Sequence, residues 1–146
     1  MRQAGPQDVA AVAALVETAF ARHVEAVGRR PAPMDADHAG HVARGEQYVR
    51  DGEHGTLVAG VVLIEEPDHL VVHNVAVAPA HQGAGHGRAL MAFAEDEARR
   101  RGLAEVRLHT NAAMADNLAM YPRLGFAETG RAFHAGFHRV FFAKRV

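Results

Sequence analysis

A glycine-rich segment in the middle of the chain has the residue types and spacing to bind an anion. Residues 73–88 read HNVAVAPAHQGAGHGR and pass from a predicted strand through a loop into a predicted helix. Gly83, Gly85 and Gly87 lack side chains, so a ligand can approach the backbone N–H groups closely. These N–H groups lie at a helix start, where four donors are unpaired and the helix dipole is positive. The segment therefore predicts a phosphate or pyrophosphate site.

Two familiar phosphate-binding patterns do not fit this loop. A P-loop requires GxxxxGK[ST], and no Lys-Ser or Lys-Thr follows the glycines. The dinucleotide fingerprint requires GxGxxG early in a Rossmann unit, whereas residues 83–87 read GAGHG after several predicted strands. A purely structural turn is the remaining alternative, although such a turn would not need three alternating glycines.

Residues 75–91, VAVAPAHQGAGHGRALM, closely resemble the acetyl-CoA signature of the GNAT acetyltransferase superfamily. In that signature Q/R-x-x-G-x-G/A follows a strand and opens a helix, and Gln82, Gly85 and Gly87 occupy its fixed positions. The order of the predicted elements also matches the family over nearly the whole chain. The resemblance implies an α/β fold with a mixed, mainly antiparallel sheet flanked by helices, a splayed central strand pair, and acetyl-CoA as the cosubstrate.

The resemblance also assigns residues to the acetyl-CoA site. In the family, the unpaired backbone of the splayed strand binds the pantetheine arm, which here implies the main chains of Val75 and Val77. Their side chains are expected in the core. Successive N–H groups of the family's loop hold the CoA pyrophosphate, which in this chain implies Gln82, Gly83, Ala84, Gly85, His86, Gly87 and Arg88.

A second motif, Tyr-x-x-x-Gly-Phe, follows a predicted amphipathic helix and begins at Tyr121. In the family that it resembles, the matching hydroxyl points at the CoA sulfur, so Tyr121 is the predicted general acid for the departing thiolate. A tyrosine packed in the core with a hydrogen-bonded hydroxyl is the alternative. The family usually has an asparagine seven residues earlier, where this chain has Met114; Asn117 or Asn111 is expected to take over its contact to the cosubstrate.

Direct transfer to an amine also requires a proton acceptor, and the sequence leaves several open. Glu65, Glu66, His73 and His109 are the candidates, with a chain of water molecules as the alternative. An unperturbed histidine has a suitable pKa of about 6.5. Strand alternation places His73 on the same face as Val75, unless a bulge at the splay inverts that parity.

The resemblance implies that the first two helices and their connection select the amine. Arg22, Arg29, Arg30, Met34 and Tyr48 are therefore expected along the wall of the acceptor site. The arginines allow an acidic group on the substrate, although arginines on a loop are usually just solvated.

Helical and strand periodicities predict the elements that position these residues. Asp8 is expected to cap a helix with Val9, Val12, Val16 and Phe20 at helical spacing. The predicted order is β-α-α-β-β-β-α-β-α-β-β, typical of an α/β sheet of mixed direction. The other elements are a helix from about residue 37, strands 47–50, 56–65, 69–78 and 105–110, helices 88–101 and 116–124, and a closing hairpin of 127–133 and 137–144.

Composition narrows the class of protein. The 146 residues fit one domain, 1–146, and the net charge of -1 lacks the basic excess typical of nucleic-acid binding. No apolar run approaches the ~20 residues that span a bilayer, and the first residues, MRQAGPQD, are too polar for a secretion signal. The chain has no cysteine, which favours a cytoplasmic protein. Of the eleven histidines, His134 and His138 have a spacing that could share a metal on a helix, but they lie in a strand-like region without an HExxH pattern or clustered carboxylates, so no metal is expected.

Together these observations predict an acetyl-CoA-dependent N-acetyltransferase. It would move an acetyl group directly to a primary amine of an unidentified small molecule or peptide, without nucleic-acid or membrane partners. The alternative is a non-catalytic module on the same fold that senses acyl-CoA or docks to a partner. A homodimer is possible because the resembling family often forms one.

Overall fold

Seven strands form one sheet in the computed structural model, which describes residues 1–146, and their order is β1-β2-β3-β4-β5-β7-β6. All neighbouring strands are antiparallel except β4 and β5, which are parallel. This mixed, mainly antiparallel sheet is the predicted one. The strands are β1 (Arg2–Gln3), β2 (Gln47–Asp51), β3 (Leu57–Glu65), β4 (Leu70–Val77), β5 (Glu105–Asn111), β6 (Ala127–His134) and β7 (Phe137–Arg145).

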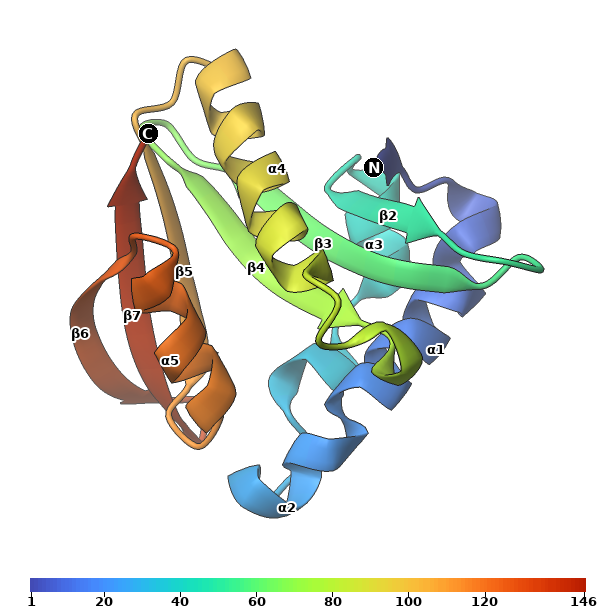
Figure 1. The fold of residues 1–146 in the computed structure, drawn as a ribbon, viewed down its shortest axis with the longest axis horizontal. Coiled ribbons are helices and arrows are strands. Elements are labelled where there is room, and N and C mark those ends of the chain that lie inside the picture. Colours follow the sequence, from blue (N-terminus) through green and yellow to red (C-terminus); the bar gives the residue numbers. More distant parts are fainter.

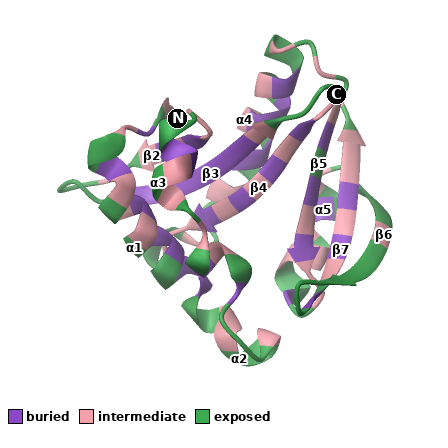
Figure 2. Cartoon of the chain, turned by 180° about the vertical axis from the view of Figure 1, so that it is seen from behind, coloured by how far each residue is buried: buried purple, intermediate pink, exposed green.

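Helices cover both faces of the sheet (Figure 1, Figure 2). A buried cluster of 16 residues joins the sheet to α4 and α5, and a second cluster of 12 residues joins the opposite face to α1 and α3. The helices are α1 (Val9–Phe20), α2 (Val24–Val27), α3 (His38–Ala43), α4 (His86–Arg100) and α5 (Ala115–Arg123), with short 3-10 turns at Pro6–Asp8, Ala21–His23, Ala32–Asp35 and Pro79–His81.

The predicted order of elements is confirmed, with α2 as an addition, and two local predictions are wrong. Helix α4 begins at His86 instead of residue 88, because Gly85 adopts a left-handed conformation and serves as its N-cap. Asp8 precedes α1, but its carboxylate does not cap that helix. It accepts instead from the Gly5 N–H at 2.8 Å and forms an ion pair with Arg2. Both carboxylate oxygens are therefore engaged before the first helical turn.

The central strands β4 and β5 are splayed, as predicted (Figure 1). Their ladder has three residue pairs, which run from Leu70 opposite Val106 to Val72 opposite Leu108. Beyond these pairs β4 continues to Val77 without a partner on this edge. The two strands thus open a slot in the middle of the sheet.

A β-bulge lies where the slot begins. Leu63 of β3 pairs with Val72 and Val62 pairs with Asn74, so His73 is an extra residue on β4. An extra residue inverts the side-chain alternation of its strand. Val72 and Val75 consequently both pack with the 16-residue cluster beneath α4 and α5, called here the α4/α5 cluster. Ala76 belongs to the 12-residue cluster beneath α1 and α3, the α1 cluster. The bulge sends the side chains of residues 75 and 77 to one face of the slot and those of 74 and 76 to the other.

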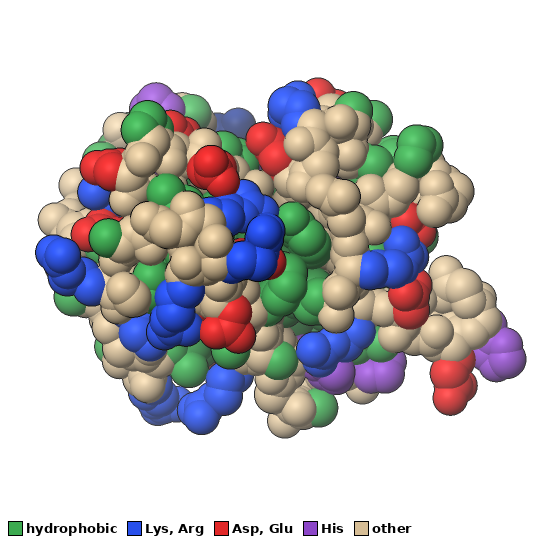
Figure 3. All heavy atoms as spheres, turned by 90° about the horizontal axis from the view of Figure 1, so that it is seen from above, with side chains coloured by type: hydrophobic (Ala, Val, Ile, Leu, Met, Phe, Trp, Pro, Cys, Tyr) green, Lys and Arg blue, Asp and Glu red, His purple; other side chains and the backbone are tan.

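Charges of both signs cover the outside of the molecule. Lys and Arg number 16 and Asp and Glu number 17, and they are interspersed on the face that Figure 3 shows. No helix is both long enough and apolar enough to cross a membrane. No three histidine or acidic side chains come together in a way that would hold a metal ion.

Candidate active site

A cavity of about 590 Å³ occupies the slot between β4 and β5. On the α4/α5 face it is lined by the glycine-rich loop and by α5, and on the opposite face by the end of α1 and by Pro31, Ala32 and Pro33. The cavity therefore passes through the sheet from one layer of helices to the other. Two molecules that enter from opposite faces would meet beside the bulge of β4.

The loop before α4 offers unpaired backbone donors, as the sequence predicts. The N–H groups of residues 83–88 donate to no backbone carbonyl, because the first α4 bond runs from Ala89 N–H to Gly85 C=O. Gly83 and Gly85 have φ angles of +82° and +86°, a left-handed conformation that only glycine adopts without strain. The donors and the positive helix end suit a pyrophosphate.

The structure brings nearly all predicted cosubstrate residues to this cavity. The Gln82 side chain donates to the Val77 carbonyl at 3.0 Å and thereby fixes the loop to the end of β4. Ala84 is exposed and does not line the cavity, although its N–H belongs to the unpaired run. The predicted residues that do line it are Val75, Val77, Gln82, Gly83, Gly85, His86, Gly87, Arg88, Asn117 and Tyr121.

We expect Gly85→Ala to raise the Kd for acetyl-CoA about 10-fold, because a methyl group would stand before the unpaired donors. Gly55→Ala, in the turn between β2 and β3, is the matched control. Both glycines have left-handed φ angles, +86° and +74°, and an added Cβ would meet no atom within 4 Å at either. Each variant should lose about 1 kcal/mol of unfolding free energy. Calorimetric titration with acetyl-CoA measures the difference, and equal Kd values for the two variants would contradict the assignment.

Tyr121 lies in the core and also borders the cavity. Its ring packs at 5.5 Å from Phe142 and 6.0 Å from Phe126, measured between ring centroids. Burial raises the pKa of its hydroxyl to about 12, and no hydrogen bond contributes to that shift. The hydroxyl is thus protonated at neutral pH and lacks the protein partner that a purely structural tyrosine would have.

Asn117 holds the start of α5 and lines the cavity at the same time. Its amide donates to Thr110 Oγ1 at 3.2 Å and lies 3.5 Å from Met114 Sδ. The amide nitrogen is therefore used within the protein, and the carbonyl oxygen is the group left for a ligand. Asn111 also borders the cavity. A role for either asparagine toward the cosubstrate stays a prediction.

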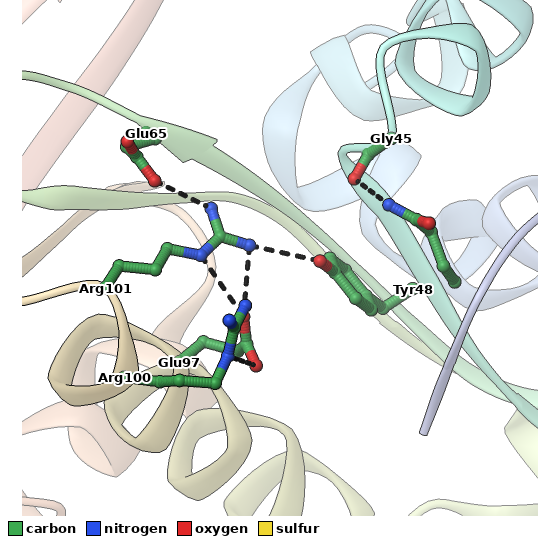
Figure 4. A network of polar contacts seen from close by, with 7 residues as sticks. Gly45, Tyr48, Glu65, Glu97, Arg100 and Arg101 are labelled. Carbon is green, nitrogen blue, oxygen red and sulfur yellow. Dashed lines mark hydrogen bonds and ion pairs between the residues drawn. The ribbon is translucent and has the colours of Figure 1, made fainter.

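Among the candidate bases, the two glutamates lie away from the cavity. Glu65 is at the end of β3 and pairs with Arg101 at 3.3 Å, in the network that Figure 4 shows. Glu66 lies in the exposed turn that follows. Neither carboxylate lines the cavity, because the strand pair is still closed at this end of the sheet.

His73 and His109 both line the cavity, from opposite sides of the slot. Their ring centroids are 6.5 Å apart, and the ring of His41 lies 5.3 Å from that of His73. Burial is the main cause that lowers the pKa of His73, and the charge of Arg139 acts in the same direction. Burial and Arg139 lower the pKa of His109 to about 4. Both imidazoles are therefore neutral at pH 7 and can accept a proton.

The lowered pKa of His109 predicts a pH-dependent stability. The unfolded chain binds a proton on this histidine below pH ~6.5, whereas the folded chain does so only near pH 4. The free energy of unfolding should therefore fall as the pH falls through this window. His109→Gln should lose less stability between about pH 7 and about pH 5 than the wild type. Denaturant unfolding of both proteins at the two pH values measures this, and parallel losses would contradict it.

The predicted wall of the acceptor site is only partly correct. Arg22 lines the cavity and lies 3.9 Å from Asp116 of α5, across its opening. Arg30 is engaged with Glu17 and Asp35, and Met34 is buried in the α1 cluster.

The prediction that Tyr48 lies along the wall of the acceptor site is wrong, because it does not line the cavity. Its ring packs on Phe93, and its hydroxyl accepts from Arg101 at the far end of α4 (Figure 4). The sequence analysis missed several lining residues, which include Phe20, His23, Asn74, Phe137 and Arg139. The alternation of residues 137, 139 and 141 in the closing strand was the available signal for the last two.

Proteins with similar sequences are named as acetyltransferases. The chain is 34% identical over 87 residues to the [ribosomal protein bS18]-alanine N-acetyltransferase of Escherichia coli K12, which covers 58% of this chain and 59% of that protein. It is 36% identical over 93 residues to the streptothricin acetyltransferase of Streptomyces lavendulae, which covers 62% of this chain and 49% of that protein. The chain thus matches only about half to three fifths of the length of these curated relatives.

The whole fold also has solved counterparts. The PaiA N-acetyltransferase of Thermoplasma acidophilum, solved in complex with coenzyme A, superposes with a TM-score of 0.83 over 99% of this chain and 97% of its own. At 12% identity this likeness concerns the fold alone. The model of the Acetyltransferase (GNAT) family matches residues 10–126, most of the chain. On that match and on its splayed sheet, the chain belongs to the GNAT family of acetyltransferases.

Proposed function

We propose that this chain transfers the acetyl group of acetyl-CoA directly to a primary amine. The observation that carries the proposal is the cavity through the sheet, which has unpaired N–H donors at one mouth and Tyr121 beside its middle. The names of two similar chains place an alanine of a ribosomal protein and an antibiotic among the acceptors of relatives. A small molecule or a peptide amine is the corresponding acceptor class here.

The two ends of the cavity have different tasks. The loop N–H groups would bind the pyrophosphate of acetyl-CoA, and the unpaired edge of β4 at Val75 and Val77 would bind its pantetheine arm. This leaves the thioester in the slot, beside the bulge. Holding it there against an amine from the α1 side supplies up to about 7–11 kcal/mol of the barrier in favourable geometry.

The reaction exchanges one bond for another. The neutral amine attacks the thioester carbonyl, the C–N bond forms and the C–S bond breaks. A backbone N–H near Val75 would stabilise the oxyanion. Tyr121 would donate its proton to the departing thiolate and recover one from solvent, while the amine loses its own proton to a base.

We assign that base to His73. It lies on the bulge itself, where the acetyl carbon would be held, and it faces the α1 side from which the amine arrives. Glu46 bonds the neighbouring ring, with His41 Nδ1 at 2.8 Å from its carboxylate, and its charge opposes the lowering of the His73 pKa. His109, with a pKa of about 4, is too weakly basic to match neutral conditions.

The test is CoA-thiol release from acetyl-CoA across a panel of amines and peptides, beside thermal stabilisation by acetyl-CoA and by ATP. A ligand at 100 times its Kd adds about 2.7 kcal/mol to the free energy of unfolding. Stabilisation with amine-dependent release supports the transferase. Stabilisation without release favours a non-catalytic acyl-CoA-binding module, and no acetyl-CoA effect contradicts both. A homodimer stays a prediction for the same preparation, to be measured by light scattering.

A further inference from the structure

The acceptor mouth of the cavity, formed by His73, His109, Phe137 and Arg139 with Arg29 beside them, is positively charged. Strand β7 places alternate side chains on its two faces. Val140 and Phe142 point into the α4/α5 cluster, so Phe137 and Arg139 lie on the opposite face, from which the amine arrives. His109 is on the same face, because its ring packs at 5.8 Å from that of Phe141.

Arg139 has no counterion within the protein. It is half-buried and lines the cavity, yet no acidic side chain pairs with it and it donates no hydrogen bond. Arg139 lines the same cavity as His73 and His109, and its charge lowers the pKa of both. A partly desolvated cation without a counterion is unfavourable, and a ligand that supplies the anion removes this cost.

Arg29 is exposed and does not itself line the cavity, but it adds a second positive charge beside Phe137. Its guanidinium lies 4.5 Å from the ring centroid of Phe137, and Arg139 lies 6.0 Å from the same centroid. Arg29 Nη1 also lies against Gly136 in the β6–β7 turn, where an added Cβ would clash with it. No acidic residue pairs with Arg29 either. Two unpaired guanidinium groups thus flank one aromatic ring.

The phosphates of acetyl-CoA do not account for these charges. Arg88 opens α4 and Arg123 ends α5, so both line the cavity on the face where the loop N–H groups are. Arg139 is on the other face. The only acidic side chain of the lining is Asp116, which faces Arg22. The acceptor mouth is therefore positive while its histidines are neutral.

Such a mouth discriminates among amines. A simple amine reaches it as an ammonium ion and is repelled by Arg139, whereas an amine that carries its own anion is attracted. We propose that the acceptor carries a carboxylate near the reacting amine and that Arg139, assisted by Arg29, binds it. The planar guanidinium matches a carboxylate in two parallel hydrogen bonds. This inference rests on the proposed function, because it names the substrate class of the same site.

The test compares each free L-amino acid with its carboxamide, which lacks the anion. An amide lowers the pKa of the amine and so raises its reactive neutral fraction, so a preference for the acid cannot come from amine reactivity. We expect kcat/KM for the preferred acids to exceed that of their amides about 10-fold or more. In Arg139→Gln this ratio should fall to 1 or below, because the amide then has the larger reactive fraction, and in Arg139→Lys it should fall only partly. In Arg123→Gln the ratio should stay at the wild-type value.

The carboxylate could be the α-carboxylate of a free amino acid or an acidic side chain of a peptide, and a second panel of substrates distinguishes the two. Dipeptide amides with Asp or Glu at the second position are compared with those that carry Asn or Gln. A preference confined to the free amino acids identifies the α-carboxylate, and a preference among the dipeptides identifies an acidic side chain. Equal rates in both panels, or a ratio that Arg139→Gln leaves unchanged, would overturn the proposal.

Binding without turnover separates this proposal from the proposed function. The same acids and amides are titrated against protein saturated with CoA, and the change in melting temperature is recorded. If acids stabilise wild type but not Arg139→Gln while no amine releases CoA thiol, the anion site stands and the transferase is wrong. If acids and amides act alike in binding although turnover is seen, the transferase stands and the anion site is wrong.

Discussion

Tyr121→Phe is expected to lower kcat for acetyl transfer about 100-fold and to leave the Kd for acetyl-CoA unchanged. The variant removes one oxygen atom whose proton would go to the departing thiolate. The ring keeps its contacts with Phe126 and Phe142, and the hydroxyl makes no hydrogen bond that could be lost. The fold should therefore be as stable as the wild type or more stable.

Tyr48→Phe is the matched control, since Tyr48 is the other tyrosine of the chain and its hydroxyl contacts only Arg101, far from the cavity. It should leave kcat unchanged. With a pKa of about 12, Tyr121 stays protonated through neutral and mildly alkaline pH, so kcat should show no alkaline limb from this residue there. Stopped-flow or steady-state thiol release measures all three proteins. Full activity in Tyr121→Phe would mean that positioning alone drives the reaction.

His73→Gln is expected to lower kcat/KM about 100-fold at neutral pH. The base must be unprotonated to act, so the wild-type rate should show a rise with pH through a midpoint below the ordinary 6.5, separate from the rise at higher pH that the amine's own pKa sets. Burial is the main cause that sets this midpoint, and the charges of His41, Glu46 and Arg139 modify it.

His73→Gln should remove the acid limb of the profile as well as the rate, which a merely structural role would not do. His109→Gln is the control, because its ring also borders the cavity but has a pKa near 4. It should keep the acid limb and most of the rate. The assignment fails if the limb persists in His73→Gln or if both variants lose the same activity.

Local sequence predicts well which residues lie on the loop side of the cavity. The loop before α4 is built from residues adjacent in the chain, so its glycines, helix start and unpaired N–H groups follow from their order. The sheet order and the slot follow from the resemblance that this loop carries. The Tyr-x-x-x-Gly-Phe motif likewise predicts the importance of Tyr121, although its place beside the slot also depends on packing against Phe142 of β7.

The acceptor half depends on contacts between distant segments, which the sequence does not encode locally. The bulge at His73 is set by the register of β4 against β3, and it decides which face each later side chain takes. Glu65 carries a carboxylate, which can serve as a base, but the ladder is closed at its end of the strand and it does not line the cavity. Arg29 and Arg139 meet at Phe137 only because the β6–β7 turn folds over the α2 connection.

The short ladder between β4 and β5 gives the molecule a mechanical property. Only three residue pairs of β4 and β5 join the two halves of the sheet, β1 to β4 and β5 to β6, so the backbone connection between the halves is short. Rotation about this connection breaks few backbone hydrogen bonds, so we expect the width of the slot to change more easily than the longer ladders on either side of it. A pantetheine arm that forms hydrogen bonds with the unpaired edge of β4 would extend this short ladder. Binding of the cosubstrate would then also restrict the motion of the two halves of the sheet. Release of the CoA product would restore that motion after each turnover.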